Sequence, residues 1–183
     1  GHSDSRRRTD HGGATCKCCN AMAFCMEIAD GADEVRKAAR EQIRQGADQI
    51  KIMVSGGVAS PYDPLDSRQY SLDEISAAVE EADAFGKYTQ AHAYTPVAIQ
   101  RAIGQGVRTI EHGNLIDAAS AKLMAKKGAY LVANLVAYYA MKERAKEFGM
   151  AKDMLEKNDM VIDGGLRSLE ICKRAGVKVD RDA

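Results

Sequence analysis

The sequence predicts an α/β fold built on a parallel sheet, and two observations support this. From about residue 31 onward, amphipathic helical segments alternate with short apolar segments, and a glycine follows most of the helical ones. Strands joined by a helix run parallel, because returning to the same end of a sheet needs a crossover connection. A glycine just past a helix favours the left-handed conformation that ends it.

The repeating unit can be followed along the whole region. Each expected helix carries apolar residues at helical spacing and stops close to a glycine. The expected helices cover residues 33–45, 71–85, 95–105 and 117–127, and a longer helical stretch, broken near Gly149 and Asn158, ends at Gly176. The expected strands cover residues 49–54, 87–93, 107–111, 129–134 and 177–179.

Three helix starts carry their own sequence marks. Ser71 and Glu74 form a capping box, in which each side chain can accept a hydrogen bond from the other residue's free backbone N–H. Pro96 stands at a first helical position, where a missing N–H costs nothing. Asp117 is the expected cap of the following helix.

Residues 1–30 lack any sustained period, so we expect a long loop that serves a site. Four of the five cysteines lie there. Cys16 and Cys19 form a Cys-x-x-Cys pair, but a structural zinc site needs a second pair, which favours a cysteine-rich surface loop. An odd cysteine count without an apolar leader favours a reducing, cytoplasmic location.

The charge balance and the absence of long apolar segments argue against nucleic acid and membrane as partners. Lys and Arg total 26, as do Asp and Glu, so no net charge attracts nucleic acid or an anionic membrane. No segment approaches the roughly 20 apolar residues that cross a bilayer. We therefore expect neither a nucleic-acid nor a membrane partner.

Three polar residues lie at or toward the ends of three consecutive expected strands: Lys51, His92 and His112. Ligands of parallel α/β folds bind at the carboxyl ends of the strands. Neighbouring strands lie roughly 4.8 Å apart, so two histidines at equivalent positions can share a divalent ion. This pattern predicts a metal site, although a histidine can also be a hydrogen-bonded core residue. Lys51 is either a modified or paired group at this site or an edge-strand lysine that reaches solvent.

Three segments in correct order resemble the amidohydrolase superfamily. They are residues 46–58, which include Lys51, the sequence Ala91-His92-Ala93-Tyr94, and residues 110–114 around His112. The resemblance is nearest to the branch that holds imidazolonepropionase-like enzymes and prolidase-like Xaa-Pro or Xaa-Arg/Lys carboxypeptidases. It extends from a Gly-His-Ser-Asp turn at residue 1 to about Val179.

The resemblance implies a (β/α)8 barrel of the TIM type. Residues 1–30 would form the loop leading from the third strand. Residues 31–183 would form a partial metal-dependent hydrolase barrel with strands four to seven and the start of strand eight.

The resemblance also implies the chemistry. His92 and His112 would bind one or two divalent ions, expected to be zinc, and Lys51 would react with carbon dioxide to form a bridging carbamate. Water activated by the metal would attack the carbonyl of an amide, cyclic amide or dipeptide C–N bond. His2 and Tyr94 would hold or polarise that carbonyl. Tyr138, which follows the seventh strand, either lines the substrate pocket or serves ordinary packing.

Two family features have no counterpart in this chain. The first-strand His-x-His pair is missing, and Asp180 and Asp182 lack the eighth-strand context that would make either the proton shuttle. The catalytic acid–base residue is therefore unassigned. We expect this chain alone to be inactive, and to need either self-association or the remainder of the barrel.

Two other functions remain open on the sequence. The chain could be a non-catalytic α/β module with structural histidines, which would be metal-free. An unrelated barrel could use Lys51 to form a Schiff base, which borohydride would trap.

Overall fold

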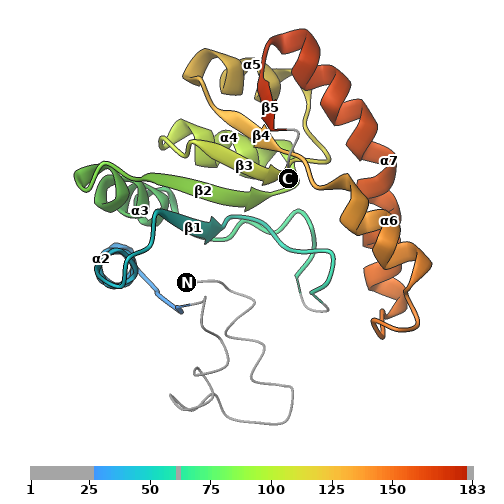
Figure 1. Ribbon diagram of the computed structural model, residues 1–183, viewed down its shortest axis with the longest axis horizontal. Helices are drawn as coiled ribbons and strands as arrows, with labels where there is room; N and C mark the ends of the chain where they lie inside the picture. The colour runs from blue at the N-terminus through green and yellow to red at the C-terminus, as the bar shows by residue number, and fades with distance from the viewer. Residues whose placement is uncertain (1–26, 61–62, 181–183) are drawn as a thin grey trace.

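The computed structural model describes residues 27–60 and 63–180. Within them, five strands form a single parallel sheet in the order β1-β2-β3-β4-β5, which is also their order in the chain (Figure 1). The strands are β1 (Gln49–Met53), β2 (Tyr88–Ala93), β3 (Thr109–His112), β4 (Tyr130–Val132) and β5 (Lys178–Asp180). The helices are α2 (Ala32–Arg44), α3 (Leu72–Ala84), α4 (Pro96–Gly104), α5 (Ala118–Lys127), α6 (Leu135–Glu143) and α7 (Lys152–Ala175). The predicted parallel α/β fold is confirmed.

The expected caps of α3 and α5 are present, whereas the Thr95 side chain at the start of α4 makes no capping hydrogen bond. The Ser71 side chain accepts the Glu74 backbone N–H while the Glu74 carboxylate accepts that of Ser71. Asp117 caps α5 by accepting from the Ser120 backbone at 2.7 Å. Gly128 and Gly176 end α5 and α7 in the left-handed conformation.

The core lies between the helices and one face of the sheet. Ile52, Ala91, Ile110 and Leu131, one from each of β1 to β4, are at most 4% exposed and belong to the same core cluster as the buried faces of the helices. The residues that alternate with them, such as Lys51 and Gln90, project from the opposite face. Helices therefore cover one face, as in each section of a barrel wall.

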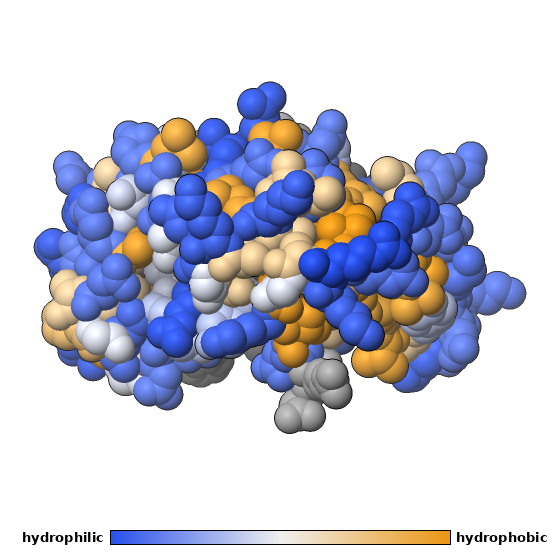
Figure 2. Space-filling view, turned by 90° about the horizontal axis from the view of Figure 1, so that it is seen from above, coloured by the Kyte–Doolittle hydropathy of each residue, from blue (hydrophilic) through white to orange (hydrophobic). Residues whose placement is uncertain are grey.

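The opposite face borders a hollow of about 440 Å³ in the part of the chain that the structure describes. Its lining includes the polar and charged side chains of Gln90, Thr109, Glu111 and Lys178. On the outer surface, the view of Figure 2 shows apolar patches broken up by long polar side chains. In none of the described helices do length and apolarity together suffice for a membrane span.

Two details of the last third differ from the expectation. The fourth strand is shorter, covering only Tyr130–Val132, and Asn134 is already the N-cap of α6. The break near Gly149 is confirmed, since Gly149 lies between α6 and α7 with φ of 60°. The break near Asn158 is wrong: α7 continues through it, and the fully buried Asn158 amide donates to the Tyr138 backbone carbonyl at 3.0 Å. A polar residue that suggested a turn thus makes a tertiary contact.

Candidate metal centre

His92 lies near the end of β2 and is 5% exposed. Its Nε2 lies 2.9 Å from the backbone carbonyl oxygen of Gly56. A carbonyl can only accept a hydrogen bond, so Nε2 carries the hydrogen and Nδ1 holds the lone pair of the neutral ring. In a neutral His92 ring, Nδ1 is therefore the nitrogen that could coordinate a metal ion.

His112 ends β3, but not at the position equivalent to His92. The register pairs His92 with Glu111 and pairs His112 with Ala93, so the expectation of equivalent positions is wrong by one residue. Strict alternation would turn His112 toward the helices with Ile110. Its φ of 78° breaks the alternation, and its ring centroid lies 4.7 Å from that of His92. The two imidazoles are adjacent despite the offset.

Two tyrosine hydroxyls extend from His112 into the protein. The Tyr138 hydroxyl lies 2.6 Å from His112 Nδ1, and the Tyr94 hydroxyl lies 2.8 Å from that of Tyr138. Both tyrosines are at most 3% exposed. The Tyr94 ring also stacks on His112, with centroids 5.2 Å apart, and meets His92 edge-on at 4.9 Å. The four rings form one packed aromatic group.

Burial keeps His112 and the two tyrosines uncharged near neutral pH. It lowers the pKa of His112 from 6.5 to about 3, with smaller contributions from the nearby charges of His92 and Lys51. It also raises the pKa of Tyr94 to about 12 and that of Tyr138 further. Neutral imidazole is the form that binds a metal ion.

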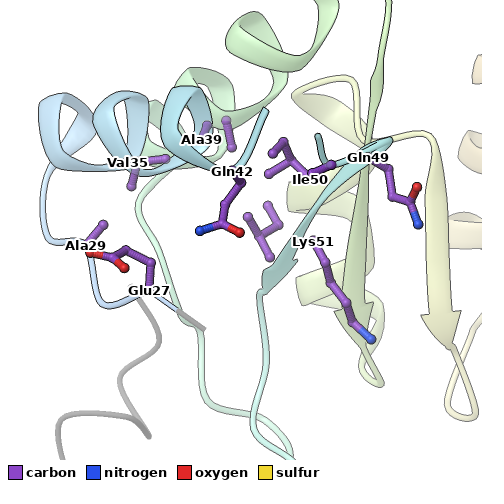
Figure 3. A pocket seen from close by; sticks show the side chains of 11 residues that line it. Glu27, Ala29, Val35, Ala39, Gln42, Gln49, Ile50 and Lys51 are labelled. Carbon is purple, nitrogen blue, oxygen red and sulfur yellow. The ribbon is translucent and has the colours of Figure 1, made fainter. Parts of the chain in front are cut away.

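Lys51 leaves β1 on the side away from α2, as Figure 3 shows. Its neighbours Ile50 and Ile52 are buried while Lys51 is exposed, which confirms the expected alternation. The register pairs Met53 with His92, so Lys51 lies two residues earlier on the same face, about 7 Å along the sheet. Its charge is close enough to lower the pKa of His112. The 250 Å³ cavity in Figure 3 lies on the α2 side of β1, away from the imidazoles.

The residues present fit part of a divalent-ion site. Each histidine has one ring nitrogen engaged by a protein group, which is how metal-ligating histidines are usually oriented. Among residues 27–60 and 63–180, no three His, Cys, Asp or Glu side chains cluster closely enough to hold an ion by themselves. This section of the sheet supplies two imidazoles and a nearby lysine toward such a site.

Three supporting residues escaped the sequence analysis. The Gly56 carbonyl oxygen accepts a hydrogen bond from His92 Nε2. Ser55 is fully buried and accepts the Tyr94 backbone N–H at 3.2 Å. Lys157 of α7 donates to the carbonyls of Gly57, Ser60 and Asp63, which fixes the loop after β1. In the sequence, the adjacent pair Gly56-Gly57 was the feature that could have drawn attention to Gly56. No feature of the sequence pointed to Lys157.

Some predicted positions lie outside the described residues. They are His2 and the cysteines between positions 16 and 25, together with most of the expected loop at 1–30. Asp180 is described, at the end of β5.

The chain matches a known protein family over most of its length. The model of the amidohydrolase family matches residues 12–179. The chain belongs to the amidohydrolase family. Its parallel sheet with helices on one face is part of a TIM-type barrel, as predicted. Members of the family generally use divalent metals, which agrees with the paired imidazoles.

Named relatives lie in the predicted branch of this family. The chain is 36% identical over 152 residues to ochratoxinase of Aspergillus niger, covering 83% of this chain and 32% of that protein. A prolidase structure complexed with N-methylphosphonate-L-proline is 50% identical with a TM-score of 0.86, covering 92% of this chain and 42% of that one. A Xaa-Pro dipeptidase with bound methionine is 30% identical with a TM-score of 0.74, covering 82% and 37%. The amidohydrolase chain thus spans about a third to two fifths of these relatives' length.

Proposed function

We propose that this chain carries one side of the metal centre of a hydrolase that cleaves amide C–N bonds. The observation that carries the proposal is the pair of imidazoles 4.7 Å apart, with His92 Nε2 held by the Gly56 carbonyl and His112 Nδ1 held by the Tyr138 hydroxyl. Membership of the amidohydrolase family supports it, since that family generally uses divalent metals.

His92 through Nδ1 and His112 through Nε2 would hold the ion, which we propose to be zinc. Zinc accepts imidazole ligands readily and has no redox chemistry of its own. A bound divalent ion would lower the pKa of water to about 7 and polarise the substrate carbonyl. The ring nitrogens that would face away from the ion already have partners in Gly56 and Tyr138. Metal binding would therefore require no new hydrogen-bond partners for these nitrogens.

Lys51 would supply a further ligand as a carbamate formed with carbon dioxide. The ammonium group cannot bind a cation, whereas a carbamate carries two oxygens and a negative charge. Lys51 projects from the face of the sheet that carries His92, with its side chain exposed. An exposed amine on that face is open to carbon dioxide.

The substrate class we propose is a dipeptide or a related amide. The structural relatives include proteins named prolidase and Xaa-Pro dipeptidase, and the sequence relative is named ochratoxinase. Tyr94 lies beside both imidazoles, and with His2 it would orient the scissile carbonyl. We propose that turnover needs the remaining ligands on further polypeptide, which the longer relatives possess, or on a second copy.

Metal content tests the proposal directly. The dialysed protein should retain zinc in a fixed ratio, measured by mass spectrometry of the metal, and His92→Ala or His112→Ala should lose most of it. His11→Ala, which removes a histidine that is not among the proposed ligands, is the matched control. A metal-free wild-type protein would instead favour a non-catalytic module.

The state of Lys51 needs a separate measurement. Native mass spectrometry should show a gain of one carbon dioxide that is absent from Lys51→Met, and mild acid should remove it. Borohydride trapping of a carbonyl substrate on Lys51 would contradict the carbamate and indicate a Schiff base.

A further inference from the structure

The Tyr138 side chain is buried against His112 and Tyr94. It is 2% exposed, and its hydroxyl lies between His112 Nδ1 and the Tyr94 hydroxyl, at 2.6 and 2.8 Å. The Asn158 amide, itself fully buried, donates to its backbone carbonyl and ties α6 to α7 at that point. Both the hydroxyl group and the backbone carbonyl of Tyr138 are therefore fixed by hydrogen bonds.

The position of one hydrogen decides what His112 can do. If the Tyr138 hydroxyl donates to Nδ1, the ring hydrogen sits on Nε2, and that nitrogen cannot bind a cation. If His112 Nδ1–H donates to Tyr138, Nε2 keeps its lone pair. The two arrangements place the same heavy atoms at the same distances.

In the second arrangement, the hydrogen bond from His112 can be followed by another from Tyr138 to Tyr94. Once the Tyr138 oxygen accepts from His112, its own hydrogen can be donated to Tyr94, 2.8 Å away. His92 provides a parallel, because the Gly56 carbonyl already requires a hydrogen on its Nε2. Both rings would then carry their hydrogen on the nitrogen turned toward the protein.

We propose that Tyr138 is a positioning residue that keeps the ring hydrogen of His112 on Nδ1 and thereby presents Nε2 to the metal ion. This rests on the proposed metal function and deepens it. In this role Tyr138 acts through His112 and takes no part in the reaction itself. The Tyr94 hydroxyl oxygen accepts the hydrogen bond that the Tyr138 hydroxyl donates, which fixes the orientation of the Tyr138 hydroxyl.

The test compares Tyr138→Phe with Tyr139→Phe in the full-length protein. Tyr139 is the next residue on α6 and is 44% exposed, so its variant makes the same chemical change away from the site. We expect Tyr138→Phe to lower zinc affinity by about 10–100-fold, the usual effect of losing such a partner. Tyr139→Phe should stay within about threefold of wild type. Competition with a chelator of known affinity gives these values.

A spectroscopic measurement separates positioning from general damage to the fold. Nitrogen NMR of protein labelled at histidine, assigned with His112→Gln, reports which ring nitrogen of His112 carries the hydrogen. In the metal-free wild type we expect it on Nδ1, and in Tyr138→Phe a shift toward Nε2. A hydrogen on Nε2 in the wild type would overturn the proposal without any variant.

The outcomes distinguish this inference from the proposed function. If wild-type protein binds no zinc, the proposed function fails, and the positioning role fails with it. If wild type and Tyr138→Phe bind zinc equally, the metal centre stands and the role of Tyr138 is overturned. A Tyr138→Phe loss that Tyr139→Phe reproduces also overturns it.

Discussion

At the scale of single residues, backbone freedom matters most where the loop after β1 meets His92. A Cβ added at Gly56 would lie 2.0 Å from the carbonyl oxygen of Pro64, a backbone atom that cannot turn aside. At Gly57 the nearest atoms would be 3.9 Å away, an ordinary contact. The glycine whose carbonyl orients His92 is therefore the one that cannot gain a side chain.

We expect Gly56→Ala to lower the free energy of unfolding by about 1–3 kcal/mol, because the loop must move to relieve the clash. Gly57→Ala, the matched control, should change it by less than about 0.5 kcal/mol. Urea unfolding followed by circular dichroism measures both. Equal stability of the two variants would contradict the close approach of Gly56 to Pro64.

At the scale of elements, α7 approaches the loop after β3 through two adjacent glycines. A Cβ on Gly164 would lie 2.5 Å from the backbone oxygen of Asn114, and one on Gly165 would lie 2.5 Å from Leu135. Glycine inside a helix costs about 1 kcal/mol relative to alanine. The helix tolerates that cost here because contact with Asn114 and Leu135 leaves no room for a methyl group.

Gly164→Ala should therefore destabilise the protein by about 1–3 kcal/mol, although alanine is the better helix former. A Cβ added at Gly104, at the exposed end of α4, would meet no atom within 4 Å, so Gly104→Ala should be neutral or stabilise by up to about 1 kcal/mol. Thermal unfolding of both variants gives the comparison. Stabilisation by both would show that α7 does not pack this closely.

The α2–α3 pair depends on pH through one carboxylate. Glu81 of α3 is 7% exposed and accepts two hydrogen bonds from Arg40 of α2, at 2.7 and 2.8 Å. These bonds, with a contribution from Arg36, hold the pKa of Glu81 below its usual 4.5. A carboxyl whose pKa is lower in the folded state stabilises the fold above its unfolded pKa and loses that contribution as pH falls.

Glu81→Gln should therefore have a lower urea midpoint than wild type at pH 7, with the gap narrowing between about pH 5 and pH 3. The control is Glu156→Gln on α7, whose carboxylate lies 3.6 Å from the exposed Lys152 and should give little difference at either pH. A gap at Glu81 that stays constant with pH would rule out the ion pair as its cause.

At the scale of the whole molecule, the sheet has two unpaired edges among the described residues, along β1 and β5. A parallel strand edge offers a row of free N–H and C=O groups to any other strand. The β1 edge also borders the apolar side chains of Ile50 and Ile52 in the cavity of Figure 3. The longer relatives contain further polypeptide beyond the part that this chain matches.

We expect the 183-residue polypeptide by itself to associate with rising concentration, because its open edges pair with one another. A polypeptide that supplies a full barrel should not do so. Sedimentation velocity at several concentrations distinguishes the two. A monomer at every concentration would mean that residues of this same chain cover the edges.

The sequence by itself determined the repeating helix–strand unit, the parallel sheet and the carboxyl-end positions of His92 and His112. These follow from local periods and caps, such as the Ser71–Glu74 box, which do not depend on distant parts of the chain. The resemblance around Lys51, His92 and His112 also placed the chain in its family. The same local evidence misjudged Asn158, because a buried amide and a turn-forming amide look alike in a sequence.

Only the tertiary structure decided how the site is assembled. The one-residue offset between His92 and His112 is corrected by a single positive φ, which no local pattern predicts. The contact between His112 and Tyr138 joins residues 26 apart and depends on how α6 packs against α7. Such contacts are decided by packing between elements, so they exist only after the helices and the sheet have come together.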